Sequence, residues 1–74
     1  DDLFWDAVAV FVDSQKASVS LLQRRLRIGY ARAARLVDLM EDRGIVSSLD
    51  ANKKREILID SEQLEKLYAN RKSI

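Results

Sequence analysis

Several residue types that build active sites and cross-links are missing from this chain. It has no cysteine and no histidine, which excludes disulfides, thiolate metal sites and the commonest general base. The remaining serines, lysines and carboxylates show no spacing that pairs a nucleophile with a base or repeats metal ligands, and there is no glycine-rich phosphate loop. We therefore expect a non-catalytic binding domain that uses no metal and no cofactor.

Proline is also absent, and the only glycines are Gly29 and Gly44, which suits a compact and mainly helical chain with few long loops. The 74 residues allow one small domain with a modest core. No apolar run approaches the roughly 20 residues that cross a bilayer, and no basic signal peptide opens the chain. We expect a soluble domain that makes no membrane contact and is a piece of a larger protein.

The spacing of apolar residues predicts a first helix over residues 3–15. Asp1 and Asp2 stand at its start, where the positive end of the helix dipole favours acidic side chains. The apolar residues at helical spacing are Phe4, Ala7, Val8, Phe11 and Val12. This face is predicted to pack into the core.

A short second helix is predicted after Ser18, a candidate N-cap, and Ser20 with Gln23 three residues later forms a predicted capping box. The helix ends around Arg27, because Gly29 adopts backbone angles that other residues avoid.

A third helix is predicted from Tyr30 to Arg43, with Gly44 at its C-cap. The turn between the second and third helices, about three or four residues with a glycine, has the length of a helix-turn-helix.

The period changes after the third helix. The segments "IVSSL" and "REILI", separated by "DANKK", predict two short antiparallel strands. Asp60 or Ser61 then starts a last helix with Leu64, Leu67 and Tyr68 on one side, and the final "RKSI" is expected to fray. The predicted fold is mainly α with a small antiparallel β-hairpin: a winged helix-turn-helix over residues 1–60 and a C-terminal helical extension over residues 61–74.

A helical wheel divides the third helix into two faces. The apolar side comprises Tyr30, Ala33, Leu36, Val37 and Met40. The opposite sector comprises Ala31, Arg35, Asp38 and Asp42, with Arg32 on one shoulder. This sector is predicted to enter the DNA major groove, where an arginine donates two hydrogen bonds to guanine.

The aromatic and long apolar side chains have a plainer role as core. Those predicted to lie in the core or at its edge are Phe4, Trp5, Phe11, Tyr30 and Met40. Trp5 stands next to Phe4 on one helix, so it is the one expected to remain partly exposed.

The charges are segregated, although the net charge is only +1. Residues 14–37 hold Lys16 and five arginines, and all twelve acids lie outside that span. The arginines either solvate two amphipathic helices or form a positive face for phosphates. The tip residues Lys53, Lys54 and Arg55 either are solvated or contact phosphates. Asp38 either pairs with Arg35 along the helix or accepts from cytosine N4.

The run "ASVSLLQRRLRIGYARAARLVDLMEDRGIV", continuing to "REILI", resembles the C-terminal γ domain of the bacterial DNA translocases FtsK and SpoIIIE. The resemblance covers residues 1–59, from the acidic start "DDLFWDAVAVFV", and leaves residues 61–74 unmatched. It implies a winged helix that binds short, polar, G-rich octamers of double-stranded DNA and orients a hexameric motor during chromosome segregation. For FtsK it also implies contact with the XerD recombinase, and a cytoplasmic domain whose parent protein is anchored in the membrane at the septum.

The resemblance also assigns residues. It puts base contacts on Ala31, Arg35 and Asp38, where Asn and Glu stand in enterobacterial-type members at the first and last of these positions. Because an alanine methyl contacts a thymine methyl but forms no hydrogen bond to a base edge, the octamer stays open. The residues expected at the DNA backbone are Ser20, Gln23, Arg24, Arg25, Arg32, Lys53, Lys54 and Arg55.

Two other functions compete with DNA loading. The arginine face is also suited to an acidic surface of a protein partner such as the recombinase, since winged helices do both. A dimeric transcription regulator is a third hypothesis, against which no long apolar dimerisation helix is visible. Steep weakening of binding with salt would favour phosphate contacts over an apolar protein interface.

Overall fold

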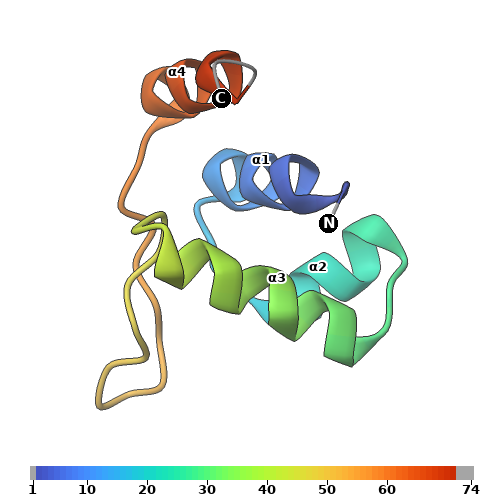
Figure 1. Cartoon of the computed structure of the whole chain (residues 1–74). Coiled ribbons are helices and arrows are strands. Elements are labelled where there is room, and N and C mark those ends of the chain that lie inside the picture. The colour runs from blue at the N-terminus through green and yellow to red at the C-terminus, as the bar shows by residue number, and fades with distance from the viewer. Residues whose placement is uncertain (1, 72–74) are drawn as a thin grey trace.

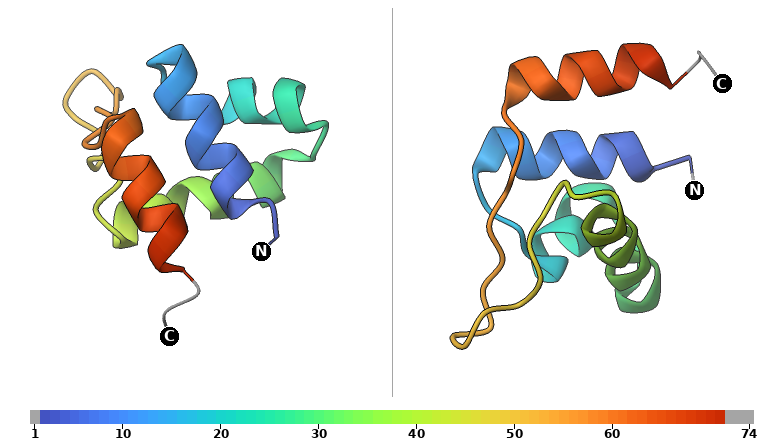
Figure 2. Two further views of the ribbon diagram at one scale, coloured as in Figure 1. Left: turned by 90° about the horizontal axis from the view of Figure 1, so that it is seen from above. Right: turned by 60° about the vertical axis from the view of Figure 1, so that its left-hand side comes forward.

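The computed structural model describes residues 2–71, which form four helices joined by short turns and one longer excursion of the chain (Figure 1). The helices are α1 (Phe4–Ser14), α2 (Val19–Leu26), α3 (Tyr30–Asp42) and α4 (Ser61–Asn70). We call residues 45–60, which lead away from α3 and back to α4, the return loop. α1 lies between α4 on one side and the α2–α3 pair on the other (Figure 2).

The core lies where α1, α2 and α3 meet. The fully buried residues are Phe4, Ala7, Val8, Phe11, Val12, Leu22, Ala33, Leu36, Val37, Met40, Ile45 and Val46. All five apolar positions expected to bury from the first helix do so, and they follow the helical period of about 3.6 residues. The core prediction for the first helix is confirmed.

Two of the aromatic predictions have different outcomes. Trp5 is half-buried, as expected for the aromatic at the core edge. Tyr30 is 66% exposed, so its assignment to the core is wrong. Tyr30 is the first residue of α3, and at this end the apolar face of the helix extends past the core. A helical wheel gives the direction of a side chain around the helix axis but not its position along that axis.

The start of α2 is fixed by Ser18, whose hydroxyl accepts a hydrogen bond from the Leu21 amide at 3.3 Å. The predicted N-cap is confirmed. Since the helix already begins at Val19, Ser20 lies inside it and the predicted capping box with Gln23 is wrong.

The three-residue turn between α2 and α3 has the predicted helix-turn-helix length, but its geometry differs from the expectation. Arg27 takes the left-handed conformation (φ 54°), whereas Gly29 is extended (φ −75°, ψ 167°) and caps α3. The left-handed residue directly follows the last turn of α2, where its amide donates to the Gln23 carbonyl, and Ile28 packs against the core beyond it.

Gly44 ends α3 as predicted. It has φ +74°, its amide donates to the Glu41 carbonyl at 3.0 Å, and the Ile45 amide donates to the Met40 carbonyl at 2.9 Å. This pair of bonds is a Schellman motif, in which glycine adopts the left-handed angle without steric cost. It turns the chain so that Ile45 enters the core.

The two predicted strands are not formed: the described part of the chain contains no strand. The arms of the return loop meet at one antiparallel bridge between Val46 and Ile57, with the Ser47 amide bonded to the Glu56 carbonyl at 2.9 Å. No further strand lies beside them within residues 2–71, and a lone pair of short arms has little stability as a sheet. The prediction of a mainly helical fold is therefore confirmed. The predicted β-hairpin is wrong, because these residues form a loop whose two arms meet at one bridge.

α4 starts where the sequence predicts. Asp60 and Gln63 form a capping box, with the Gln63 amide 2.8 Å from the Asp60 carboxylate and the Asp60 amide 3.0 Å from the Gln63 side-chain oxygen. No residue of α4 is fully buried; Leu64 packs against the core, and the Tyr68 ring lies edge-on to Trp5. The expectations for Asp1 and for the last three residues lie outside the described residues.

Candidate nucleic-acid interface

The outward face of α3 carries the three predicted base-contacting residues. Ala31, Arg35 and Asp38 are all exposed, and they lie opposite the buried residues of the same helix. Within residues 2–71 no ion pair joins Arg35 to Asp38, so the intrahelical pairing that competed with DNA contact is not formed. An acid that follows its cation along a helix is the less favourable order for such a pair.

Charge is graded along α3. Its amino-terminal half carries Arg32 and Arg35, both exposed, whereas Asp38, Glu41 and Asp42 follow in the second half. The positive potential of this face is therefore concentrated near the helix-turn-helix turn, and an anion is attracted there more than at the end of the helix.

The residues predicted from α2 do not all share one surface. Ser20 and Arg24 are exposed and Gln23 is half-buried. Arg25 lines a depression of about 670 Å³ formed by the second half of α1 and the start of α4, with Asp13 and Asp60 among its other walls. Arg25 is also exposed, and it faces this depression on the α1–α4 side of α2.

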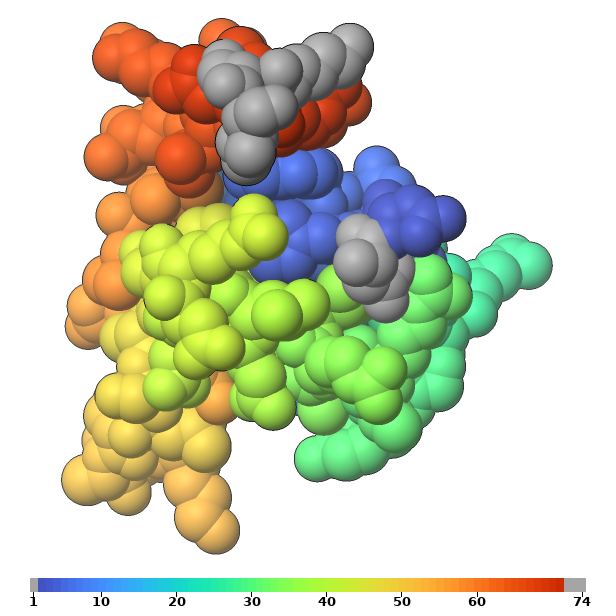
Figure 3. All heavy atoms as spheres, in the orientation of Figure 1, coloured from blue at the N-terminus to red at the C-terminus, as the bar shows by residue number. Residues whose placement is uncertain are grey.

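The tip of the return loop presents its lysines to solvent. The Asp50 carboxylate accepts from the amides of Asn52 (2.8 Å) and Lys54 (2.9 Å), and the Lys53 amide donates to the Asp50 carbonyl at 2.9 Å. An aspartate that bonds the following amides in this way is a common organiser of tight turns. Lys53 and Lys54 are exposed, and the loop projects beyond the helical body beside α3 (Figure 3).

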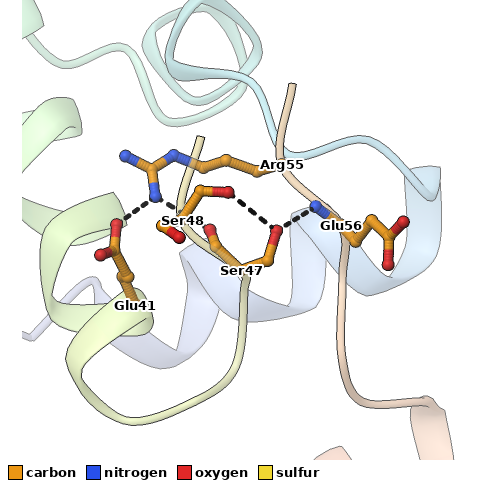
Figure 4. A network of polar contacts seen from close by, with 5 residues as sticks. All are labelled: Glu41, Ser47, Ser48, Arg55 and Glu56. Atoms are coloured by element: carbon orange, nitrogen blue, oxygen red, sulfur yellow. Dashed lines mark hydrogen bonds and ion pairs between the residues drawn. The ribbon is translucent and has the colours of Figure 1, made fainter. Parts of the chain in front are cut away.

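Arg55 behaves differently from its lysine neighbours. Its guanidinium is paired with Glu41 at the end of α3 and donates to the Ser47 carbonyl at 3.0 Å (Figure 4). Only 13% of the side chain is exposed. The structure therefore does not bring Arg55 to the tip with the lysines.

Lys16 lies near Lys54 of the loop tip, but it is not among the residues predicted to contact DNA. Lys16 is exposed and lines a depression of about 660 Å³ between the α1–α2 connection and the second arm of the return loop, together with Ser18 and Lys54. Its membership of the acid-free span of residues 14–37 was the sequence signal that could have identified it.

Among the residues that the structure describes, no group of His, Cys, Asp or Glu side chains is arranged to hold a metal ion. The helices between residues 2 and 71 also include none with the length and apolar character to cross a membrane.

The fold and this surface define a small helical domain built around a helix-turn-helix pair with a cationic outer face. A family model described as "Ftsk gamma domain" matches residues 1–60. The chain therefore belongs to the FtsK gamma-domain family. This domain is a regulatory part of the translocases and not their ATPase motor, so the expected absence of catalysis is confirmed.

Curated relatives agree with the family match. The chain is 50% identical over all of its 74 residues to the DNA translocase FtsK of Caldanaerobacter subterraneus subsp. tengcongensis, of which it covers 10%. It is 61% identical over 59 residues (80% of the chain) to FtsK of Oceanobacillus iheyensis and 52% over 67 residues (90%) to SpoIIIE of Bacillus subtilis, covering 8% of each. The chain thus spans about a tenth or less of these relatives.

Proposed function

We propose that this domain binds double-stranded DNA with sequence preference and thereby orients a translocase motor. In this proposal α3 enters the major groove, and the return loop serves as the wing of a winged helix, touching the neighbouring backbone. The observation that carries it is the exposed Arg35, which lies on the outward face of α3 without an ion pair in the described structure. Arginine to guanine is the commonest specific contact between a side chain and a base.

The proposed base contacts come from Ala31, Arg35 and Asp38. Arg35 donates to guanine O6 and N7, Ala31 packs against a thymine methyl, and Asp38 accepts from cytosine N4. These contacts support a G-rich site, which we propose to be a short polar octamer, as the family resemblance implies. A site without two-fold symmetry has a direction on the duplex, so a bound domain carries that direction to the motor.

The proposed phosphate contacts come from residues around this face. They are Ser20, Gln23, Arg24 and Arg32 from the helix-turn-helix, and Lys53 and Lys54 from the tip of the loop. These contacts supply affinity without sequence information. Arg25 is left out of this set, because it lines a depression on the α1–α4 side of α2 that Asp13 and Asp60 also line.

A few base contacts from one small domain give modest affinity. We propose that several copies, held by a hexameric translocase on the cytoplasmic side of the membrane, act together on neighbouring sites, which raises the effective concentration of each. The XerD recombinase stays a proposed second partner, in keeping with the same family resemblance.

The experiment is a fluorescence anisotropy titration of the 74-residue chain with a duplex of tandem G-rich octamers and with a scrambled duplex of equal composition, at several salt concentrations. Arg35→Ala is expected to remove about 1–3 kcal/mol of preference for the octamers. Lys53→Ala is expected to weaken both duplexes alike and to lower the salt slope by about one.

Lys66→Ala is the matched control, because it removes an exposed cation from α4, a helix that contacts α1 and lies away from α3. It should leave both titrations unchanged. Equal losses on both duplexes for Arg35→Ala would contradict base contact by α3. Binding that ignores both sequence and salt would direct attention to a protein partner.

A further inference from the structure

A polar network joins the end of α3 to both arms of the return loop. Arg55, from the second arm, pairs with Glu41 on the last turn of α3 and donates to the carbonyl of Ser47 on the first arm (Figure 4). The Ser47 hydroxyl in turn accepts from the Glu56 amide at 2.8 Å. The guanidinium of Arg55 on the second arm therefore contacts both the end of α3 and the first arm of the loop.

The other restraints on the return loop lie near its base, where Ile57 and Ile59 pack against the core and the Leu58 amide donates to the Ile45 carbonyl at 2.8 Å. Ile45 and Val46 enter the core at its base, but beyond them the described loop residues include none that is fully buried, and the arms share a single bridge. Without a ladder of strands, the angle between the loop and α3 depends on the contacts that cross from one to the other. Within residues 2–71, the pair of Arg55 and Glu41 is the ion pair that joins the return loop to α3.

We propose that Glu41 and Arg55 are positioning residues that hold the loop tip at a fixed angle to α3, so that both engage one duplex at once. This inference rests on the proposed DNA binding, and it changes the role predicted for Arg55 from a phosphate contact to an internal brace. A loop already held in its bound position loses less conformational entropy on binding, which strengthens the complex.

The acid in this network gives a sharp test, because charge alone and positioning predict opposite effects. Removing a carboxylate near a DNA-binding surface lowers repulsion and should strengthen binding. If Glu41 positions the loop, Glu41→Gln should instead weaken DNA binding, by about fivefold, at the low end of the coupling found between linked sites. Asp42→Asn is the matched control: it neutralises the next residue, which is exposed and has no ion pair within the described structure.

The same titrations separate the two roles of Arg55. Arg55→Gln is expected to weaken binding as much as Glu41→Gln, with the salt slope unchanged, whereas Lys54→Gln should lower the slope by about one because it removes a phosphate contact. The double variant Glu41→Gln/Arg55→Gln should be no weaker than either single variant, since both changes break one interaction.

Amide hydrogen exchange of the free domain tests the positioning without DNA. In Glu41→Gln and Arg55→Gln, the Ser47 and Asp50 amides, which bond across the arms at 2.9 Å each, should exchange faster than in the unsubstituted chain. Core amides of α3 should keep their protection, which shows that the variants are folded.

Two results would overturn the inference: Glu41→Gln binding DNA like Asp42→Asn, or Arg55→Gln losing about one unit of salt slope as Lys54→Gln does. If the unsubstituted domain failed to bind DNA, the proposed function would fall by itself. The exchange rates would then decide the brace alone, and unchanged rates at Ser47 and Asp50 would refute it.

Discussion

Residues 4–46 and residues 47–71 of this domain are held in place by different means. The first region contains every fully buried residue of the described chain, packed between three helices. The second contains α4 and most of the return loop and has no fully buried residue; its contacts include half-buried apolar side chains, backbone hydrogen bonds between the loop arms, a capping box and ion pairs. The first region thus forms the core of the domain, and the second forms its rim.

This difference indicates how the work of the domain is divided. A close-packed core resists small changes in volume and keeps α3 rigid, which suits a helix that must match base edges. Segments with few buried apolar contacts open at lower free energy than the core does. The return loop and α4 therefore move more readily, unless polar contacts restrain them.

The largest expected effect is in the core. Phe11→Ala removes a fully buried ring, and such a change costs about 3–5 kcal/mol of unfolding free energy. Urea denaturation followed by circular dichroism measures it. Leu67→Ala on α4, where the side chain is 39% exposed, is the control and should cost far less. Equal losses at both positions would break the contrast between core and rim.

A smaller effect is expected at the start of α4. Asp60→Ala removes the carboxylate of the capping box and should cost about 1 kcal/mol of helix stability. Because α4 contacts α1 alone among the described helices, amide protection should fall in α4 and persist in α1. Glu65→Ala, which removes an exposed acid from the middle of the same helix, should not have this effect. Equal loss of protection in α1 would show that the two regions unfold as one unit.

The smallest effect is expected at the pair of Glu62 and Lys66, four residues apart on α4 and 3.6 Å from each other. Both side chains are largely exposed, so Lys66→Ala should change stability by no more than about 0.3–0.5 kcal/mol. Thermal melts at low and high salt measure the change, which should shrink with salt. A loss above about 1 kcal/mol would mean that α4 depends on this pair more than on its packing.

Most of the helical framework could be predicted because its signals are local. The apolar period of α1 and α3, the N-cap at Ser18, the glycine that ends α3 and the start of α4 at Asp60 each depend on residues within about one turn of each other. The hydrogen bonds that cap a helix form between residues close in sequence, so they can be predicted without knowing the tertiary structure. The exposed face of α3, with Arg35 on it, followed from the same periodicity.

The wrong predictions concern features that depend on contacts between residues far apart in the sequence. The strands were predicted from their β-branched composition, but the arms lack the neighbouring strands that a sheet needs. Tyr30 matched the apolar period, yet the core ends before it. For Arg55, the sequence showed the charge but not its partner Glu41, which only folding brings to it.

The sequence alone determined the helix boundaries, the buried face of α1 and the separation of cations from acids, because these depend on local spacing and on composition. Only the tertiary structure decided that Arg55 is largely buried and paired, whereas Arg24, Arg25 and Arg35 remain exposed. Glu41 and Arg55 are fourteen positions apart, and they meet because the Schellman turn at Gly44 and the return of the loop bring the end of α3 against the second arm.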